Sequence, residues 1–243
     1  MTMLRKWKLA IKIGIVAVVM ALLKFMIATN SWEFITISSL FLSVVGGTIF
    51  ILGFILSGTI SDFKESERIP VEVANSLRNI YEEGISAKKK NKKFNLDKFK
   101  KSILNVIEGF EQDLRNGARK SVEAIAEMDL SEMEKFGASS ISRIKSEQSN
   151  VRKHCLRSYQ IKETSFIPAA YAILEILAAG IIIMLLFTKI GTVYEAIFLT
   201  GMVTFFIIYM ISLIKDIDDP FEADGSADVD MFLIKELKKE LQQ

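Results

Sequence analysis

The sequence has little of the chemistry that enzymes and metal sites most often use. Its 243 residues include one cysteine and one histidine, Cys155 and His154. These are too few for an intrachain disulfide framework or for a zinc site of cysteine and histidine ligands. Phosphate-binding, zinc-protease, serine-hydrolase and dinucleotide motifs are also missing. Nucleophilic catalysis would depend on His154 alone, so we expect no catalytic residue and no enzymatic activity.

Charge of one sign is not in excess either. The chain carries 31 basic and 29 acidic residues, for a formal net charge of +2. Because the two signs are interleaved, the sequence does not predict nucleic-acid binding. Internal repeats and low-complexity tracts are absent as well, so the organisation must be found in the apolar pattern.

What the sequence does contain is apolar stretches of membrane-crossing length. A helix needs ~20 residues to cross a hydrocarbon core, and only helices or closed barrels satisfy their backbone hydrogen bonds in lipid. Four stretches meet this length: Leu9–Ala28, Phe34–Ile60, Phe166–Phe187 and Val193–Ile214. They predict an all-α integral membrane protein in which two transmembrane hairpins flank a polar helical block.

The distribution of lysine and arginine predicts the orientation. Most basic residues lie in the segment 61–165 or flank the chain's first and last apolar stretches, whereas the two hairpin loops carry only Lys189. By the positive-inside rule, both termini and the central block are cytoplasmic. We divide the chain into an N-terminal hairpin (1–62), a cytoplasmic helical region (63–165), a C-terminal hairpin (166–215) and a cytoplasmic acidic turn and helix (216–243), folded together as one domain.

The central block has the apolar periodicity of helices. We expect one helix after Pro70, over Val71–Glu83, that ends at Gly84. A second stripe is formed by Phe99, Ile103, Val106, Phe110 and Leu114, with Gly117 after it. Two further segments run from Val122 to Leu130 and from Ile141 to Ile161. Such stripes should pack together as a cytoplasmic bundle.

A run of lysines separates the first two of these helices. Lys88–Lys93 contains five lysines and no apolar period, so we expect a loop. Two interpretations stay open: a solvated loop, or a contact with anionic lipid headgroups.

The second apolar stretch carries a distinctive pattern of small and aromatic residues. Gly46, Gly53 and Ser57 or Gly58 allow close approach of helix backbones. Phe50 and Phe54 lie four residues apart and therefore share one face. Ordinary contact with lipid or with a neighbouring helix is the alternative interpretation.

Acidic residues gather after the last apolar stretch. Asp216–Asp230 contains seven carboxylates, which repel one another unless a cation or basic partner is near. Clustered oxygens suit Ca²⁺. The run is not an EF-hand, because placing Gly225 at the sixth position puts Pro220 at the first and Met231 at the twelfth. The candidate calcium ligands are Asp218, Asp219, Asp224, Asp228 and Asp230. A solvated turn before a helix over Val229–Leu241 is the alternative.

One carboxylate falls near the middle of an apolar stretch. Glu175 must face protein or water, with a serine or threonine hydroxyl as its partner, or be protonated. Lys24 and Glu195 lie nearer the ends of their stretches, where we expect them to extend toward the membrane surface.

Two short motifs resemble the bestrophin family. Leu52-Gly53-Phe54, followed by Glu67 and Pro70, is similar to the bestrophin stretch in which a pore-lining helix with L-G-F precedes a glutamate and a proline. Asp219-Pro220-Phe221, with acids and Leu233-Ile234 after it, resembles the family's N-P-F-G and acidic run. The short chain is most similar to bacterial bestrophin homologues, which implies a bacterial inner or cell membrane.

The resemblance implies a homopentameric anion (chloride) channel with five copies of the second apolar stretch around one axis. Phe50 and Phe54 would form its hydrophobic neck. Gly46 and Gly47 stand where the family has isoleucine and proline, which implies a wider or more mobile constriction. The family's calcium clasp has a denser acidic run, so Ca²⁺ is a candidate cofactor only. The implied partners are membrane lipids, small inorganic ions and further copies of the chain.

Three functional hypotheses follow from these observations. An ion channel needs a continuous axial pore that rings of Phe50 and Phe54 could gate by dewetting. A membrane-anchored scaffold or sensor needs only the cytoplasmic bundle and conducts nothing. A secondary transporter needs broken helices and a midplane site, for which Glu175 is the one indication.

Overall fold

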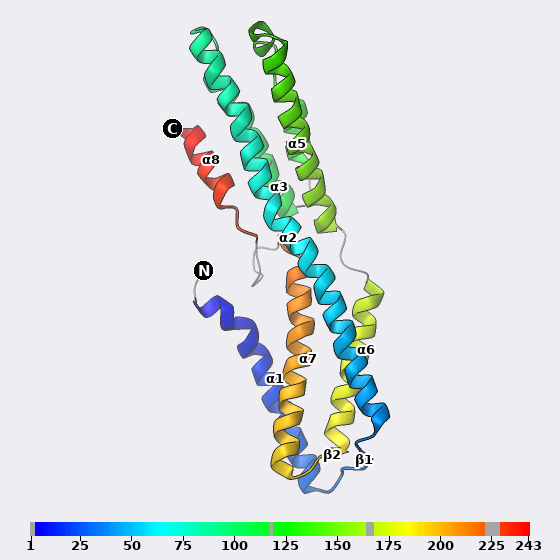
Figure 1. The fold of residues 1–243 in the computed structure, drawn as a ribbon. Coiled ribbons are helices and arrows are strands. Elements are labelled where there is room, and N and C mark those ends of the chain that lie inside the picture. The colour runs from blue at the N-terminus through cyan, green and yellow to red at the C-terminus, as the bar shows by residue number, and fades with distance from the viewer. Residues whose placement is uncertain (1–2, 117–118, 164–167, 222–228) are drawn as a thin grey trace. The chain divides into compact units, whose positions relative to one another are not determined.

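The computed structural model describes residues 3–116, 119–163, 168–221 and 229–243, and these are mostly helical (Figure 1). In chain order the elements are α1 (Met3–Thr29), β1 (Ile35–Thr36), α2 (Ser39–Lys90), α3 (Leu96–Asn116), α4 (Lys120–Ala126), a 3-10 helix η1 (Met133–Phe136), α5 (Ala138–Glu163), α6 (Pro168–Phe187), β2 (Thr188–Lys189), α7 (Val193–Asp218) and α8 (Phe232–Gln242). The predicted all-α membrane fold is confirmed.

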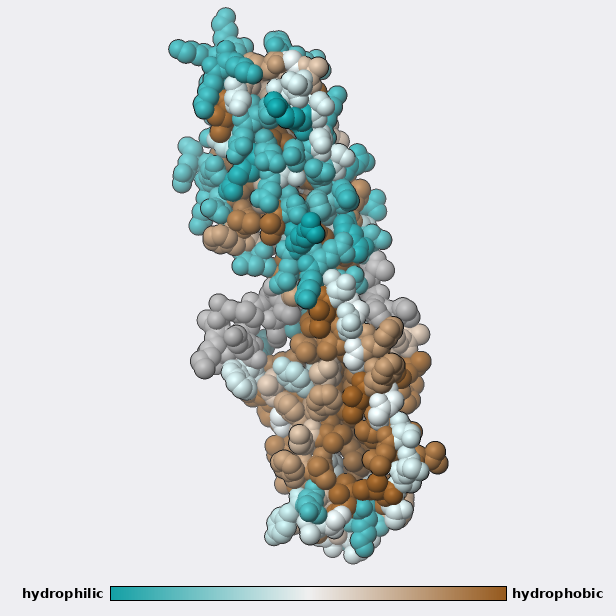
Figure 2. Space-filling model, viewed as in Figure 1, coloured by the Kyte–Doolittle hydropathy of each residue, from teal (hydrophilic) through white to brown (hydrophobic). Residues whose placement is uncertain are grey.

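The chain forms two compact units. The membrane unit is built mainly from Met1–Ser61 and Phe166–Asp219, and the polar unit mainly from Asp62–Ser165 and Asp228–Gln243. Figure 2 shows a largely apolar surface on the membrane unit and a largely hydrophilic surface on the polar unit. The further prediction that all four sequence segments fold together as one domain stays a prediction.

Four helices of the described chain are long and apolar enough to cross a membrane, and they are α1, α2, α6 and α7. Helix α1 packs along α7. A β-carbon added to Gly201 of α7 would lie 3.4 Å from the β-carbon of Ala21, so small residues set the close approach of these two helices.

The start of the second membrane helix differs from the prediction. We expected a helix from Phe34, but α2 begins at Ser39. The residues before it form β1, which pairs in parallel with β2, with Ile35 opposite Thr188. The Phe34 amide donates to the Phe187 carbonyl at 3.1 Å. Because the backbone of this extended segment is hydrogen-bonded to the end of α6 and to β2, the segment is not part of helix α2.

The polar unit has a continuous apolar core. Helices α2, α3, α5 and α8 contribute to it, with α4 and η1 beside them. The predicted stripe is confirmed, since all of its members are buried: Phe99, Ile103, Val106, Phe110 and Leu114. Full burial of such a side chain stabilises the fold by about 1.5–3 kcal/mol.

The predicted helix over Val71–Glu83 is wrong at both ends, because α2 runs unbroken from Ser39 to Lys90. Pro70 lies inside the helix, where it removes one backbone hydrogen bond. Its neighbours Ile69 and Val73 are buried in the core, and this packing outweighs the loss. Gly84 does not end the helix either. A β-carbon there would lie 2.6 Å from the Phe99 ring, so this glycine allows α3 to approach α2.

The predicted loop over Lys88–Lys93 is correct only in its second half. The first three lysines form the last turn of α2, where positive charge interacts favourably with the helix dipole. Lys88 Nζ also donates to the carbonyl oxygens of Lys92 at 3.0 Å and Phe94 at 2.8 Å. The segment that follows is thus tied back to the end of α2.

Helices α4 and α5 begin close to the starts that the sequence predicts for the third and fourth helical segments of the central block. The carboxylate of Asp113 on α3 accepts hydrogen bonds from the amides of Lys120 at 2.7 Å and Ser121 at 2.9 Å, which satisfies the first amides of α4. Helix α5 extends the predicted Ile141–Ile161 segment by a few residues at each end. Gly117 lies outside the described residues.

Candidate functional site

The membrane part of α2 has one packed face. Phe41, Thr48, Leu52, Ile55 and Thr59 are buried and recur at the three-, four- and seven-residue steps of one helical stripe. Phe41 joins an apolar cluster with Ile181 and Ile207 of α6 and α7. Leu52 and Ile55 join a second cluster with Leu174 and Ile214 of the same two helices. This face fixes α2 on the rest of the membrane unit.

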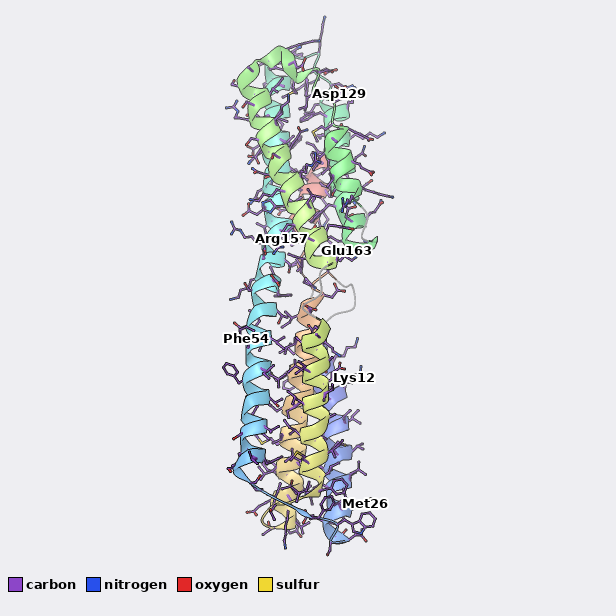
Figure 3. All side chains as sticks on the ribbon, turned by 90° about the vertical axis from the view of Figure 1, so that its right-hand side faces the viewer. Lys12, Met26, Phe54, Asp129, Arg157 and Glu163 are labelled. Carbon is purple, nitrogen blue, oxygen red and sulfur yellow. The ribbon has the colours of Figure 1, made fainter. Side chains whose placement is uncertain are left out.

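The opposite face of α2 is open within the chain. Phe50 is 76% exposed and Phe54 is 69% exposed, and Figure 3 shows Phe54 pointing away from the other helices of the membrane unit. A β-carbon at Gly46, Gly47 or Gly53 would meet nothing within 4 Å. The four residues predicted to form a neck therefore lie together on an unoccupied surface.

This open face is rich in small residues. At about 100° per residue, one sector of about 120° holds seven exposed residues: Ser43, Gly46, Gly47, Phe50, Gly53, Phe54 and Ser57. The exposed apolar residues Leu42, Val44 and Ile49 fall outside that sector, to either side of it. Three glycines and two serines leave this sector with few of the bulky apolar side chains that suit lipid, and small residues are typical of contacts between membrane helices, so the sector suits water or another protein surface better.

Glu175 lies on α6 and has a charged partner. Its carboxylate accepts a hydrogen bond from Lys215 Nζ of α7, and both side chains are about half exposed. We expected a hydroxyl partner or a protonated acid, and an ammonium group takes that place instead. The pair neutralises the carboxylate, which lowers the cost of placing it on a membrane helix.

The candidate calcium ligands are only partly within the described chain. Asp218 ends α7 and Asp219 follows it. The Asp230 carboxylate accepts a hydrogen bond at 2.9 Å from the amide of Phe232, the first residue of α8. The described residues contain no group of three acidic, histidine or cysteine side chains that could hold a metal. Asp224 and Asp228 lie outside the described residues, so calcium binding stays a prediction.

Lys24 lies in an environment that the sequence alone does not predict. We expected this side chain to extend toward the membrane surface, but it is fully buried. Its ammonium group donates to Glu33 Oε1 at 2.6 Å and to the carbonyls of Leu186 at 3.1 Å and Thr188 at 2.5 Å. The acceptors come from the segment before β1 and from the α6–β2 connection, which no sequence spacing relates to Lys24.

Glu195 was also expected to extend toward the membrane surface, but its side chain completes a capping box with Thr192 at the start of α7.

The lone cysteine lies in the core of the polar unit. Burial raises the pKa of the Cys155 thiol to about 12, so the thiol stays protonated at neutral pH and is a poor nucleophile. The neighbouring His154 is half-buried, and its burial lowers the pKa of the imidazole below 6.5. These environments give neither residue an activated catalytic role.

Comparison with known proteins finds likeness in structure alone. No protein-family model matches the sequence, and no curated protein matches it. Several solved structures of a bacterial bestrophin homologue from Klebsiella pneumoniae share the fold. The structure phased with zinc has a TM-score of 0.77 at 13% identity, covering 95% of this chain and 96% of that chain. A variant with one isoleucine replaced by threonine has a TM-score of 0.78 at 13% identity, covering 96% and 97%.

A third structure, of a variant with one leucine replaced by threonine, has a TM-score of 0.76 at 14% identity, covering 96% and 97%. These identities are too low to transfer residue roles, but the coverage leaves almost no part of either chain unmatched. The resemblance expected from two short motifs is confirmed at the level of structure. The chain therefore has the fold of the bacterial bestrophin homologues.

Proposed function

We propose that this chain is the subunit of a homopentameric ion channel that conducts anions, chloride above all, and that Phe50 and Phe54 form its hydrophobic neck. The observation that carries the proposal is the open sector of α2. Its packed face anchors the helix, while two exposed phenylalanines and five small residues face away from the chain. Five such sectors around an axis would enclose a pore with two apolar rings.

The chemistry of the sector explains how such a pore would be gated. Apolar rings dewet when narrow, and a dry constriction blocks ions without a plug. The glycines leave more room beside the rings than larger side chains would. The fold supports the proposal because it is shared with bestrophin homologues. A membrane-anchored scaffold without conductance is the alternative outcome of the test.

Ion flux in liposomes tests the neck. Replacing both phenylalanines, Phe50→Ala with Phe54→Ala, should raise chloride flux several-fold, because water can then wet the constriction. The matched control is Phe25→Ala with Phe198→Ala. These two phenylalanines are also exposed, on α1 and α7, and lie outside the α2 sector, so their loss should leave flux unchanged.

Each outcome of the flux experiment is informative. Unchanged flux in a folded double variant would assign Phe50 and Phe54 to lipid contact. Flux at background in both the wild type and the variants would favour the scaffold. The stoichiometry is tested separately by particle symmetry in electron microscopy, where fivefold symmetry around α2 is expected. Selectivity follows from the reversal potential under a chloride gradient with an impermeant cation.

We also propose that both termini and the polar unit face the cytoplasm, on the basis of the lysine and arginine distribution. Single cysteines introduced at Asn30 and Lys90 would test this in intact cells with a membrane-impermeant thiol reagent. Both residues are exposed, and the native Cys155 is buried and should not react. Labelling at position 30 and protection at position 90 are expected, and the reverse pattern would invert the orientation.

A further inference from the structure

Helix α1 has one packed face and one open face. Ile13, Ala17 and Lys24 are buried and share the side of the helix that packs on the rest of the membrane unit. The open face carries bulky aliphatic side chains that are all exposed: Ile11, Ile15, Val16, Val18, Val19, Leu22 and Leu23. At about 100° per residue they fall within one half of the helix surface. Such a face suits lipid, in contrast to the glycines and serines of the α2 sector.

Two lysines lie on this open face near the start of α1. Lys8 and Lys12 are one helical turn apart and therefore share a face, and both are exposed. Neither forms an ion pair with any residue that the structure describes. The helix itself offers no acidic neighbour, because the first acidic residue of the sequence is Glu33. The described chain thus leaves both ammonium groups without a counter-charge.

Lys12 lies within the apolar part of α1 (Figure 3). The membrane-crossing segment of α1 is Trp7–Thr29, with 23 residues. At 1.5 Å per residue this segment is about 35 Å long, so with the segment centred on a core of ~30 Å the backbone of Lys12 lies about 5 Å inside the core edge. A charged group is costly at that depth. The lysine stem therefore extends along the lipid chains and places the ammonium group among the headgroups.

An aromatic residue beside the lysines marks the level of the membrane surface. Trp7 begins the membrane-crossing segment and is 58% exposed, and tryptophan favours the boundary between lipid chains and headgroups. Lys8 follows it directly and lies at nearly the same level. The two lysines therefore present their ammonium groups, from one face of one helix, to the layer that contains the phospholipid phosphates.

We propose that Lys8 and Lys12 bind the headgroup of an anionic phospholipid, with Trp7 at the boundary beside it. The two ammonium groups donate to the phosphate oxygens, and the aliphatic face that follows along α1 contacts the acyl chains. Two unpaired positive charges attract a headgroup of net negative charge more strongly than a zwitterionic one. This site is distinct from the α2 sector, and its occupancy does not require ion conduction.

The two tryptophans of the chain allow a local measurement, because Trp7 lies near the start of α1 and Trp32 just after its end. The full chain with Trp32→Phe, in liposomes, reports from Trp7 alone. Phosphatidylglycerol brominated near the headgroup end of its acyl chains, diluted in phosphatidylcholine, should quench this fluorescence more than the same fraction of brominated phosphatidylcholine. The chain with Trp7→Phe reports from Trp32, beside Glu33, and should show no such preference.

Substitutions test whether the lysines cause the preference. Adding Lys8→Gln and Lys12→Gln to the Trp32→Phe chain should lower the preference for phosphatidylglycerol by up to about 30-fold, since each basic residue near an anionic headgroup contributes ~1 kcal/mol. Lys8→Arg with Lys12→Arg keeps both charges and should keep the preference. The matched control is Lys101→Gln with Lys145→Gln, which removes the same charge from exposed positions on the polar unit and should also keep it.

Three results would overturn the proposal. Equal quenching of Trp7 by the two brominated lipids would show no selection for negative charge, and this measurement needs no lysine variant to fold. A preference that survives both glutamine substitutions would assign it to other residues. Absence of quenching by either lipid would show that protein, such as a second copy of the chain, covers this face. None of these readouts involves flux, so their failure leaves the channel proposal to its own test.

Discussion

Lys24 and Glu33 form a buried ion pair, with Lys24 Nζ 2.6 Å from Glu33 Oε1. The lysine side chain is fully buried and the glutamate side chain is 14% exposed. The remaining two ammonium protons go to the carbonyls of Leu186 and Thr188, so the cation has three acceptors. This network joins the end of α1 to the β1–β2 pair, and β1 leads directly into α2.

Breaking this pair should be costly. Glu33→Ala leaves a buried ammonium group without its counter-charge, which costs about 3–5 kcal/mol of unfolding free energy. Lys24→Met with Glu33→Ala removes both charges and should cost less than the sum of the two single changes. Denaturant unfolding in mild detergent measures the four free energies of this cycle.

The exposed pair Arg68–Glu72 provides the control. Its side chains are 76% and 35% exposed, and an exposed pair of this kind contributes about 0–1 kcal/mol. Glu72→Ala should therefore change stability little. Additive effects of the Lys24 and Glu33 changes would show that burial does not couple these two groups.

Gly84 and Gly14 allow a second comparison. A β-carbon at Gly84 would lie 2.6 Å from the Phe99 ring, whereas one at Gly14 meets nothing within 4 Å. Gly84→Ala should destabilise the fold by about 1–3 kcal/mol through overpacking, and Phe99→Leu should recover part of this loss. Gly14→Ala should be neutral or slightly stabilising because alanine favours helix. Equal effects of both alanines on the melting temperature would contradict this account.

Features that depend on local sequence could be predicted, whereas features that depend on a distant residue could not. The four membrane helices could be predicted because a run of about 20 apolar residues has few alternatives in a chain. The stripe from Phe99 to Leu114 could be predicted because periodicity is local. The sequence predicts a helix end at Gly84 because a glycine there has the same local signature as a C-cap. Its actual role depends on Phe99, which lies on another helix.

Long-range partners account for the other failures. The acceptors of Lys24 include carbonyls 162 and 164 residues away, and Arg157 pairs with a glutamate 92 residues away. Contacts between residues so far apart in the chain leave no recognisable pattern in a single sequence. The candidate neck residues Phe50 and Phe54 could be selected by their four-residue spacing, and the structure adds that their face is open. Their role in a pore stays a prediction.

His154 should make the stability of the polar unit depend on pH. Burial is the main cause of its lowered pKa, and the charges that face it are Glu65, Arg68 and Glu72 on α2 and Lys153 on α5. The unfolded imidazole takes up a proton near pH 6.5, above the folded pKa. Stability should be fully present above pH 6.5 and fall as pH drops toward the folded pKa.

Unfolding free energies between pH 5 and 8 would measure this dependence. The variant His154→Gln cannot titrate, so its profile should be flatter across the same range. The window avoids Glu65, whose stabilising interaction is present above pH 4.5 and is lost only as pH falls below it. A wild-type profile as flat as that of the variant would rule out His154 as the titrating group.

The ion pair of Glu175 and Lys215 predicts unequal effects of two substitutions. Glu175→Gln keeps an oxygen that can accept the hydrogen bond from Lys215, whereas Glu175→Leu leaves the ammonium group without it. We expect the leucine variant to be less stable than the glutamine variant by about 1 kcal/mol. Adding Lys215→Met to the leucine variant removes the unpaired ammonium group and should therefore recover the stability that the leucine variant lost. Equal melting temperatures for the two single variants would make the pair energetically unimportant.

The acidic residues after α7 predict a response to calcium. If Asp218, Asp219, Asp224, Asp228 and Asp230 supply oxygens to Ca²⁺, millimolar calcium should raise the melting temperature by several degrees through linkage. Mg²⁺ at the same concentration should have a smaller effect, because it requires stricter octahedral geometry and gives up its waters reluctantly.

The variant Asp228→Asn with Asp230→Asn should lose the calcium shift. Asp230 also accepts a hydrogen bond from the Phe232 amide at the start of α8, and the side-chain oxygen of asparagine can accept the same bond two residues on. The melting temperature without calcium should therefore stay close to that of the wild type, which separates loss of the ion from loss of the helix. A wild type that shows no shift with calcium would leave these carboxylates as a solvated turn, with Asp230 serving α8 alone.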